Sequence, residues 1–203
     1  ESDVVVIASG ATLNATGIKG FTATSATQNN STDATKAVLN AADGSNVTIS
    51  VASATGSSKA FKLVGGTGQD SLTGGAGNDI ILGNNANDTL KGNDGDDVLT
   101  GGAGDDELHG GNNNDTFNIS AGSDTIKDLA TGDVVVITGG SVVAESVSAF
   151  NATSGTKNTG GTFEKKAAST DSTINVSGAD NTGIPGYTLT GGAGNDTLTG
   201  DGG

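Results

Sequence analysis

The chain has 203 residues, of which 33% are hydrophobic, 3% are aromatic and 35 are glycine, so a conventional large core is not expected. A formal net charge of −14 without a basic patch excludes a nucleic-acid surface and favours cations as partners. The chain has no cysteine for disulfides or thiolate metal sites, and no apolar run approaches the roughly 18 residues that cross a membrane, so no membrane insertion is expected.

The first 54 residues are rich in Thr, Ser, Ala and Asn and contain short β-prone stretches such as NVTISV. We predict that residues 1–54 form a β-rich connecting segment. The stretch STDATKAVLNAAD, residues 31–43, is the one candidate helix, because no long helical period is found elsewhere.

From Gly65 the chain repeats every nine residues. Six blocks reach Asn118, and each begins with Gly, has Asp at position six and has an apolar residue at position eight. Two further blocks keep this Asp without the paired glycines, and a block at Gly191 starts the pattern again. The position-six residues are Asp70, Asp79, Asp88, Asp97, Asp106, Asp115, Asp124, Asp133 and Asp196. The position-eight residues are Leu72, Ile81, Leu90, Leu99, Leu108, Phe117, Ile126, Val135 and Leu198.

A nine-residue period fits a short strand followed by a turn, and does not fit a helix. Two blocks would form one coil with strands on opposite sides, and successive coils would stack about 4.8 Å apart. Position eight then points inward, while positions one to six form the turns. We therefore predict an all-β parallel solenoid over 55–136, a second β-rich connecting segment over 137–181 and the start of a second roll over 182–203.

Stacked coils place the aspartates in two rows, one on each edge of the solenoid. Residues 65–118 contain ten carboxylates and one lysine, Lys91, so the rows lack protein counter-ions. Aligned carboxylates repel each other and are costly to desolvate, so a cation is expected between them. Calcium is favoured, because it takes six to eight oxygen ligands from carboxylates and carbonyls, whereas zinc would require His or Cys.

The blocks match GGxGxDxUx, and the chain thereby resembles the RTX (repeats-in-toxin) proteins. The resemblance implies a right-handed parallel β-roll in which each calcium ion lies between two turns on the same edge. Aspartates such as Asp70 with Asp88 would share an ion, giving about four strong sites and two weaker ones near Asp124 and Asp133. It also implies backbone carbonyl ligands from Gly66, Gly68, Gly75, Gly77, Gly83, Asn85, Gly92, Asp94, Gly101, Ala103, Gly110 and Asn112.

The flanking segments contain a second, longer repeat. DVVVIASG at Asp3 resembles DVVVITGG at Asp133, and FTATSATQN at Phe21 resembles FNATSGTKN at Phe150. ISVASA and INVSGA correspond in the same way, so the unit is about 126–130 residues long. Rolls would thus alternate with connecting segments that continue the solenoid or form small β caps.

Catalysis is not expected. The only histidine, His109, falls at position nine of a block, on the solvent side of a strand, and no G-x-S-x-G or H-E-x-x-H motif is present. Asp105 and Asp106 could mimic a glycosidase pair, but their place in repeated turns favours calcium ligation or solvation. For Asp124 and Asp133, turn hydrogen bonding without a metal stays an alternative to calcium.

These features predict a calcium-dependent structural repeat of a secreted bacterial cell-surface protein, in a surface layer, filament or sheath. Copies of the chain would associate, with calcium bridging spare carboxylates such as Asp94, Asp96 and Asp105. The resemblance implies type I secretion of an unfolded chain that folds in external calcium. The alternatives are the stalk of a large RTX adhesin and the non-catalytic module of a type I secreted enzyme.

Overall fold

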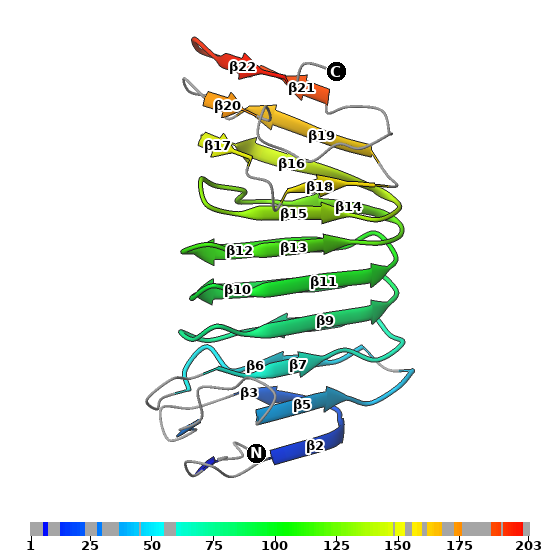
Figure 1. Cartoon of the computed structure of the whole chain (residues 1–203). Coiled ribbons are helices and arrows are strands. Elements are labelled where there is room, and N and C mark those ends of the chain that lie inside the picture. Colours follow the sequence, from blue (N-terminus) through cyan, green and yellow to red (C-terminus); the bar gives the residue numbers. More distant parts are fainter. Residues whose placement is uncertain are drawn as a thin grey trace.

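The computed structural model of the chain describes residues 6–7, 13–22, 28–29, 37–44, 46–54, 60–147, 149–152, 156–159, 162–167, 173–175, 188–191 and 193–200. None of these residues is helical, so the described part contains no helix that could span a membrane. Every strand pairing in it is parallel. The strands stack into an elongated column with the two termini at opposite ends (Figure 1). The predicted all-β parallel solenoid is confirmed.

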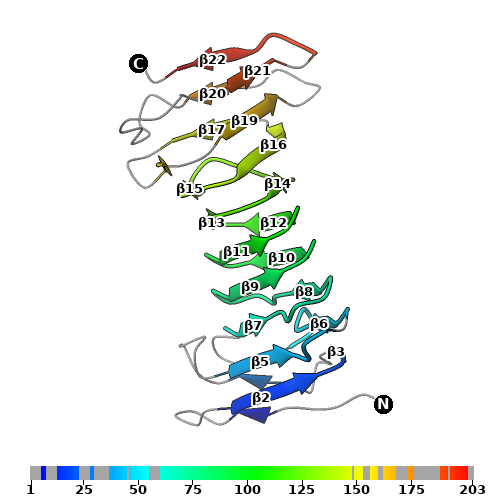
Figure 2. The same cartoon turned by 90° about the vertical axis from the view of Figure 1, so that its right-hand side faces the viewer.

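Two long sheets form most of the column, on opposite sides of it (Figure 2). The eight-stranded sheet contains β2 (Leu13–Ile18), β5 (Ala37–Ala41), β7 (Lys62–Val64), β9 (Ile80–Asn85), β11 (Val98–Ala103), β13 (Thr116–Ile119), β15 (Val134–Ile137) and β18 (Lys157–Asn158). The nine-stranded sheet contains β3 (Phe21–Thr22), β6 (Thr48–Ser50), β8 (Ser71–Thr73), β10 (Thr89–Asp94), β12 (Glu107–Asn112), β14 (Ser123–Ile126), β16 (Ser141–Val147), β19 (Thr162–Ala167) and β21 (Thr188–Thr190). Two smaller sheets pair β1 (Val6–Ile7) with β4 (Gln28–Asn29), and β20 (Thr173–Asn175) with β17 (Ala149–Asn151) and β22 (Thr197–Thr199).

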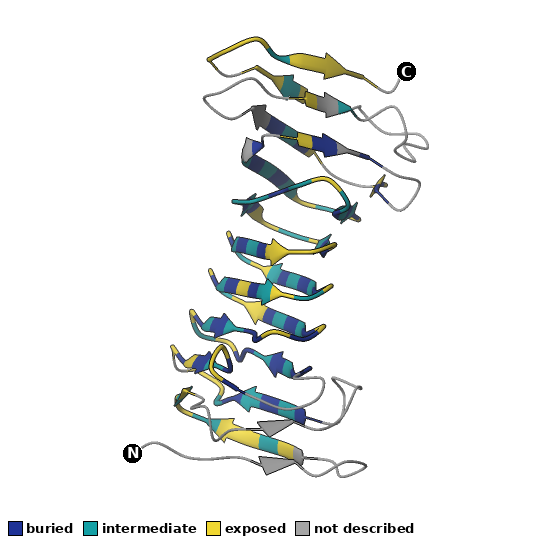
Figure 3. Ribbon diagram, turned by 90° about the vertical axis from the view of Figure 1, so that its left-hand side faces the viewer, coloured by how far each residue is buried: buried dark blue, intermediate teal, exposed yellow. Residues whose placement is uncertain are grey.

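The core is a double ladder of position-eight side chains. Residues two blocks apart pair directly, as Leu90 does with Leu108 and Leu99 with Phe117. The eight position-eight side chains from Leu72 to Val135 are all 0% exposed. Along each strand these buried residues alternate with partly exposed ones (Figure 3). The predicted coil of two blocks and its inward-facing ladder are therefore confirmed.

The turns are shorter than the sequence predicts. Four strands, β9 to β12, extend through position three of the next block, to Asn85, Asp94, Ala103 and Asn112. These positions continue the parallel ladder, because Asp94 pairs with Asn112 and Ala103 with Asn85. Stacking coils in register gives these backbone groups hydrogen-bond partners, so the turn is confined to positions four to six.

The predicted helix is wrong for the residues that the structure describes. Ala37–Ala41 form strand β5, in which buried residues alternate with partly exposed ones, and residues 31–36 lie outside the described part. The neighbouring strands β2 and β7 supply ladders on both sides, and Leu39 enters the core at 2% exposure. Tertiary pairing overrides the local sequence preference here.

The predicted longer repeat is present as a repeat of strands. The same pairing pattern occurs twice. The sets β1–β4, β2–β5–β7 and β3–β6–β8 correspond to the sets β15–β18, β16–β19–β21 and β17–β20–β22. Equivalent residues pair in both units: Phe21, Ile49 and Leu72 in the first, and Phe150, Ile174 and Leu198 in the second. Equivalent strands of the two units belong to different sheets. Strands β2, β5 and β7 belong to the eight-stranded sheet, whereas their equivalents β16, β19 and β21 belong to the nine-stranded sheet.

One core position of the second unit holds a lysine. By strand pairing Lys165 is the equivalent of Leu39. Its side chain is 0% exposed, and its Nζ lies 4.2 Å from the ring centroid of Phe150 and 4.1 Å from that of Phe163. Burial lowers the pKa of Lys165 to about 6.

Candidate metal centre

The position-six aspartates lie where the chain turns from one sheet into the other. Turns into the nine-stranded sheet carry Asp70, Asp88 and Asp106, and Asp124 has the equivalent place near the start of β14. Turns into the eight-stranded sheet carry Asp79, Asp97, Asp115 and Asp133. All eight are buried, with exposures of 1% to 3%. The structure therefore brings them together in the two predicted rows.

One carboxylate oxygen of each aspartate ties two coils together. Asp97 Oδ1 accepts the backbone N–H of Asp79 at 2.6 Å, and Asp106 Oδ1 accepts that of Asp88 at 2.8 Å. The same bond recurs in each pair of coils from Asp70 to Asp133. Sequence reasoning missed this role, although the eighteen-residue register places each side chain beside the turn before it.

The second carboxylate oxygen divides the aspartates into two groups. In Asp70, Asp79 and Asp133, Oδ2 accepts a backbone N–H from Gly66, Gly75 or Ala130. In five consecutive turns Oδ2 is buried and without a hydrogen-bond partner, and these belong to Asp88, Asp97, Asp106, Asp115 and Asp124. A buried charged oxygen without a partner is costly, so these five atoms require a cation or a proton.

Burial makes the charged form of these aspartates unfavourable. Desolvation raises the pKa of Asp88, Asp115 and Asp124 to about 7 and that of Asp97 to about 8. Repulsion between neighbouring carboxylates acts in the same direction, while backbone N–H donors lower these pKa values. The pKa of Asp106 is raised for the same reasons. A cation in the row would remove this penalty.

The position-one glycines leave room for a cluster of oxygens. At Gly92 an added Cβ would collide with Oδ2 of Asp97 and with the carbonyl oxygen of Gly110 on the next coil. At Gly83 the colliding atoms are Asp88 Oδ2 and the Gly101 carbonyl oxygen. Carboxylate and carbonyl oxygens from adjacent coils thus converge on one space. A donor set made only of such oxygens fits calcium.

Only some of the predicted carbonyl ligands lie beside an aspartate oxygen in the structure. Those of Gly83, Gly92, Gly101 and Gly110 line the space beside the position-one glycine of the preceding coil. The Gly75 carbonyl instead accepts the N–H of Asp94 at 3.2 Å. Asn85, Asp94, Ala103 and Asn112 lie at the ends of paired strands. Gly66, Gly68 and Gly77 belong to turns whose aspartates already accept two N–H groups.

The asparagines that depart from the glycine pattern have structural roles. Asn84 and Asn93 have φ of 81° and 83°, and their Nδ2 groups donate to the carbonyl oxygens of Gly65 at 2.6 Å and Gly74 at 2.8 Å. Asparagine tolerates this left-handed conformation better than most residues. These two carbonyls are therefore already engaged.

The spare carboxylates named from the sequence are exposed but hydrogen-bonded. Asp94 accepts from Asn112 Nδ2, Asp96 from the N–H of Asn114 and Asp105 from the N–H of Ser123. Each bond joins residues eighteen positions apart, so these side chains also hold adjacent coils in register.

Asp128 was not singled out by sequence reasoning. Its two carboxylate oxygens accept the backbone N–H groups of Gly110 at 2.9 Å and Gly111 at 3.0 Å. It occupies position one of its block, where the six blocks of residues 65–118 have glycine, and that departure is the signal in the sequence. Asp196, in the block that starts at Gly191, is partly exposed.

No group of three or more His, Cys, Asp or Glu side chains that could hold a metal exists in the described residues. Each space beside a position-one glycine instead brings together a carboxylate oxygen of one turn and a backbone carbonyl oxygen of the next coil, as with Asp97 and Gly110. His109 lies on an outer sheet face, as predicted, with Nε2 2.9 Å from Glu107 Oε1. Lys127 Nζ lies 2.8 Å from Glu145 and 3.6 Å from Glu107, so this face carries a short network of ion pairs.

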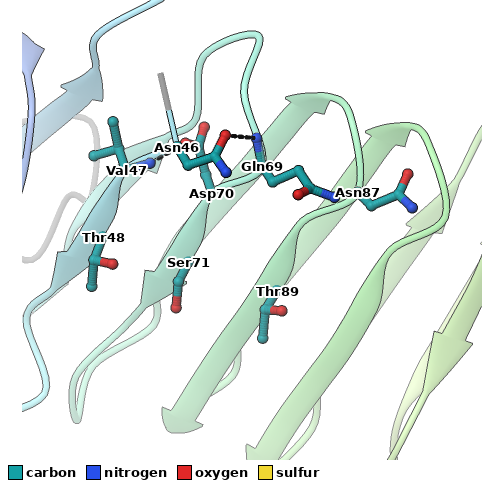
Figure 4. Close-up of a pocket in the computed structure, with 8 residues that line it drawn as sticks. All are labelled: Asn46, Val47, Thr48, Gln69, Asp70, Ser71, Asn87 and Thr89. Atoms are coloured by element: carbon teal, nitrogen blue, oxygen red, sulfur yellow. Dashed lines mark hydrogen bonds between the residues drawn. The ribbon is translucent and has the colours of Figure 1, made fainter. Parts of the chain in front are cut away.

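A groove of about 330 Å³ lies beside the first row (Figure 4). Both oxygens of Asp70 in its wall accept backbone N–H groups, from Val47 at 2.8 Å and Gly66 at 2.7 Å. The groove therefore adds no unpartnered carboxylate to the row. It is lined by Asn46, Val47, Thr48, Gln69, Asp70, Ser71, Asn87 and Thr89.

Comparison with known proteins identifies the repeats. The RTX calcium-binding nonapeptide repeat matches residues 62–90, 91–126 and 188–203, in four copies. All five aspartates with an unpartnered Oδ2 lie within the matched residues. No curated protein and no solved structure matches the chain.

Proposed function

Because the chain is an RTX β-roll protein with calcium-binding repeats, we propose that it is a calcium-dependent structural repeat of a secreted bacterial cell-surface protein. The five buried, unpartnered Oδ2 atoms, on consecutive turns that alternate between the two rows, carry this proposal. They identify the turns where folding without a cation is least favourable.

Calcium would be held by carboxylates of neighbouring turns on the same edge and by position-one carbonyls. The aspartates concerned are Asp88, Asp106 and Asp124 on one edge, and Asp97 and Asp115 on the other. When bound, the ion supplies the positive charge that the rows lack. Oδ1 continues to accept the N–H of the preceding coil, so each ion strengthens a junction that the same side chain already makes.

Asp124 and Asp133 differ in this proposal. Asp124 has an unpartnered Oδ2 and would bind calcium, with Ile119 in place of the position-one glycine of the stronger turns. Asp133 accepts N–H groups from Asp115 and Ala130, which suits a turn-stabilising role without a metal.

Far-UV circular dichroism during a calcium titration tests the proposal. We expect a disordered spectrum in chelator and a β spectrum at millimolar calcium, the affinity range of extracellular calcium modules. Magnesium is the control, because its strict octahedral geometry suits these sites poorly. An unchanged β spectrum in chelator would contradict a calcium-dependent fold.

A surface layer, filament or sheath is the assembly that we favour. The longer repeat supports it, because strand pairing continues from one unit into the next and can form extended arrays. Removing calcium should soften or dissolve such an assembly, and electron microscopy before and after chelation measures this. Isolated flexible rods would favour an adhesin stalk instead, and a catalytic domain in the full-length protein would favour a secreted enzyme.

Calcium dependence also suits export and a non-catalytic role. A chain that is disordered at the low calcium concentration inside a cell could be secreted unfolded and fold outside. A calcium midpoint below about 1 μM would contradict this, because that range is typical of intracellular sensors. We assign no catalytic role, since the partly exposed His109 lies 2.9 Å from Glu107 on the outer sheet face, beside Lys127.

A further inference from the structure

The two outer faces of the solenoid differ in chemistry. On the nine-stranded sheet the outward rows include Glu107, His109 and Glu164. On the eight-stranded sheet they include six partly exposed aliphatic residues, which we call the apolar face: Val64, Ile80, Leu82, Val98, Val134 and Val136. Figure 1 looks onto this sheet, whose strands lie side by side in a regular ladder.

The eight-stranded sheet also shows no outward acidic residue among its described strands. The chain contains 23 Asp and Glu residues, so such a surface is unusual for it. The charges that these strands direct outward are those of Lys62 and Lys157, near the two ends of the apolar face. Strand β13 crosses the apolar face and directs Thr116 and Asn118 outward between the valines of β11 and β15. Exposed apolar residues that gather on one face can mark an interaction site.

We propose that the apolar face pairs with the same face of a second copy of this chain. Charge favours this partner. Pairing two nine-stranded faces would bring Glu107 and Glu164 of both copies together in a chain of net charge −14, whereas this pairing brings two acid-free surfaces into contact. The inference rests on the proposed structural function and specifies how copies would associate.

The size of the face makes the contact weak. Five strands about 4.8 Å apart and three residues of about 3.3 Å along each strand give an area on the order of 250 Å². A stable interface buries about 800 Å² on each partner. One pair of faces therefore suffices only for reversible association, while several linked pairs acting together would be stable.

The longer repeat supplies such linked faces. Strand β21 is the equivalent of β7, which carries Val64, but it extends the nine-stranded sheet. Where the unit recurs in tandem, the equivalent face would lie on the opposite side of the column in the next unit. An array with faces on both sides joins neighbours on both sides, which builds a layer and not a closed pair.

Sedimentation equilibrium of the calcium-loaded chain tests the pairing. We expect a monomer–dimer equilibrium with a dissociation constant of about 0.1–1 mM, typical of a small interface. Val98→Glu and Leu82→Glu each introduce an acid into the apolar face and should weaken association about tenfold or more. The matched control is Thr89→Glu, because Thr89 occupies the same outward position on the nine-stranded sheet and should leave association unchanged.

Three results would overturn the inference: a chain that stays monomeric at millimolar concentration, variants that associate like the unmodified chain, or a control that weakens association equally. Circular dichroism of each protein in calcium separates folding from association, and two independent variants guard against one that fails to fold. If the unmodified chain folds in response to calcium but does not associate, only the pairing is contradicted. If the unmodified chain does not fold in response to calcium, the proposed function is contradicted.

Discussion

Replacing Asp97 by Asn should have opposite effects with and without calcium. Asp97 Oδ1 accepts the N–H of Asp79 at 2.6 Å, while its Oδ2 is buried without a partner. An Asn side chain keeps the Oδ1 acceptor and places an NH₂ donor near the carbonyl oxygen of Gly110. Asp97→Asn therefore preserves the junction between coils and removes the buried charge.

The magnitude follows from the environment of Asp97. Burial raises its pKa to about 8, and repulsion from Asp79 and Asp115 adds to the shift. A buried polar group without a partner costs about 1–3 kcal/mol, so in chelator the substitution should raise the free energy of unfolding by about this amount. With calcium at 1,000 times its dissociation constant, losing one site removes about 4.1 kcal/mol of binding free energy, so after the gain from the lost charge the variant should be less stable by about 1–3 kcal/mol.

Far-UV circular dichroism can measure both effects. In chelator, an osmolyte that favours burial drives folding, and Asp97→Asn should fold at a lower osmolyte concentration than the unmodified chain. In saturating calcium, urea unfolding should show the variant to be the less stable protein. The diagnostic result is the reversal of sign between the two conditions.

Asp70→Asn is the matched control. Both Asp70 oxygens accept backbone N–H groups, from Val47 and Gly66, so an NH₂ group would face a donor in either orientation. This variant should be destabilised with and without calcium. Asp97→Asn with equal losses in both conditions would refute the argument that Oδ2 faces a cation.

Three further outcomes are expected. Gly92→Ala should abolish calcium-induced folding in circular dichroism, because its Cβ would collide with Asp97 Oδ2, whereas Gly20→Ala, with its nearest contact at 3.7 Å, should fold normally. The raised aspartate pKa values predict that the calcium-free roll is most stable below pH 3.8 and loses stability as the pH rises through about 7 to 8. The β signal in chelator should therefore increase on acidification. The calcium concentration at the midpoint of folding should rise as the pH falls below about 7, because protons then compete with calcium for the carboxylates. Lys165→Leu restores the residue type of the equivalent Leu39 and should raise the free energy of unfolding in calcium by about 1–4 kcal/mol; a fall would show that the contacts with the phenylalanine rings outweigh the burial of the amine.

The nine-residue period was sufficient to predict the coil, the core ladder and the two rows of aspartates. Each of these features depends only on the position of a residue within its block. Leu90 and Leu108 have the same position in consecutive coils, so they stack. For the same reason Asp88 and Asp106 lie on one edge. Periodic sequence therefore predicts which residues are neighbours, even without knowledge of their contacts.

Features that depend on individual atoms were not predictable in this way. The N–H bond to Asp Oδ1 and the cap that Asp128 forms on Gly110 and Gly111 require the positions of backbone groups on the neighbouring coil. The strand at Ala37–Ala41 was missed because its partners, β2 and β7, lie outside its own sequence window. Lys165 required the alignment of strands across the longer repeat, which the connectors of unequal length obscure.

The two oxygens of one carboxylate couple stacking to metal binding, and this coupling predicts cooperativity. Asp106 Oδ1 accepts the N–H of Asp88, and Asp88 Oδ1 accepts the N–H of Asp70. Each site is therefore positioned by the coil beside it. Binding one ion should fix the neighbouring turn and lower the ordering cost at the next site. Calcium titrations should therefore give a Hill coefficient of about 2 or more. Asp106→Asn, in the middle of its row, should reduce that coefficient as well as the number of ions bound. Independent binding, with a Hill coefficient of about 1 in the unmodified chain, would show that neighbouring coils fold separately.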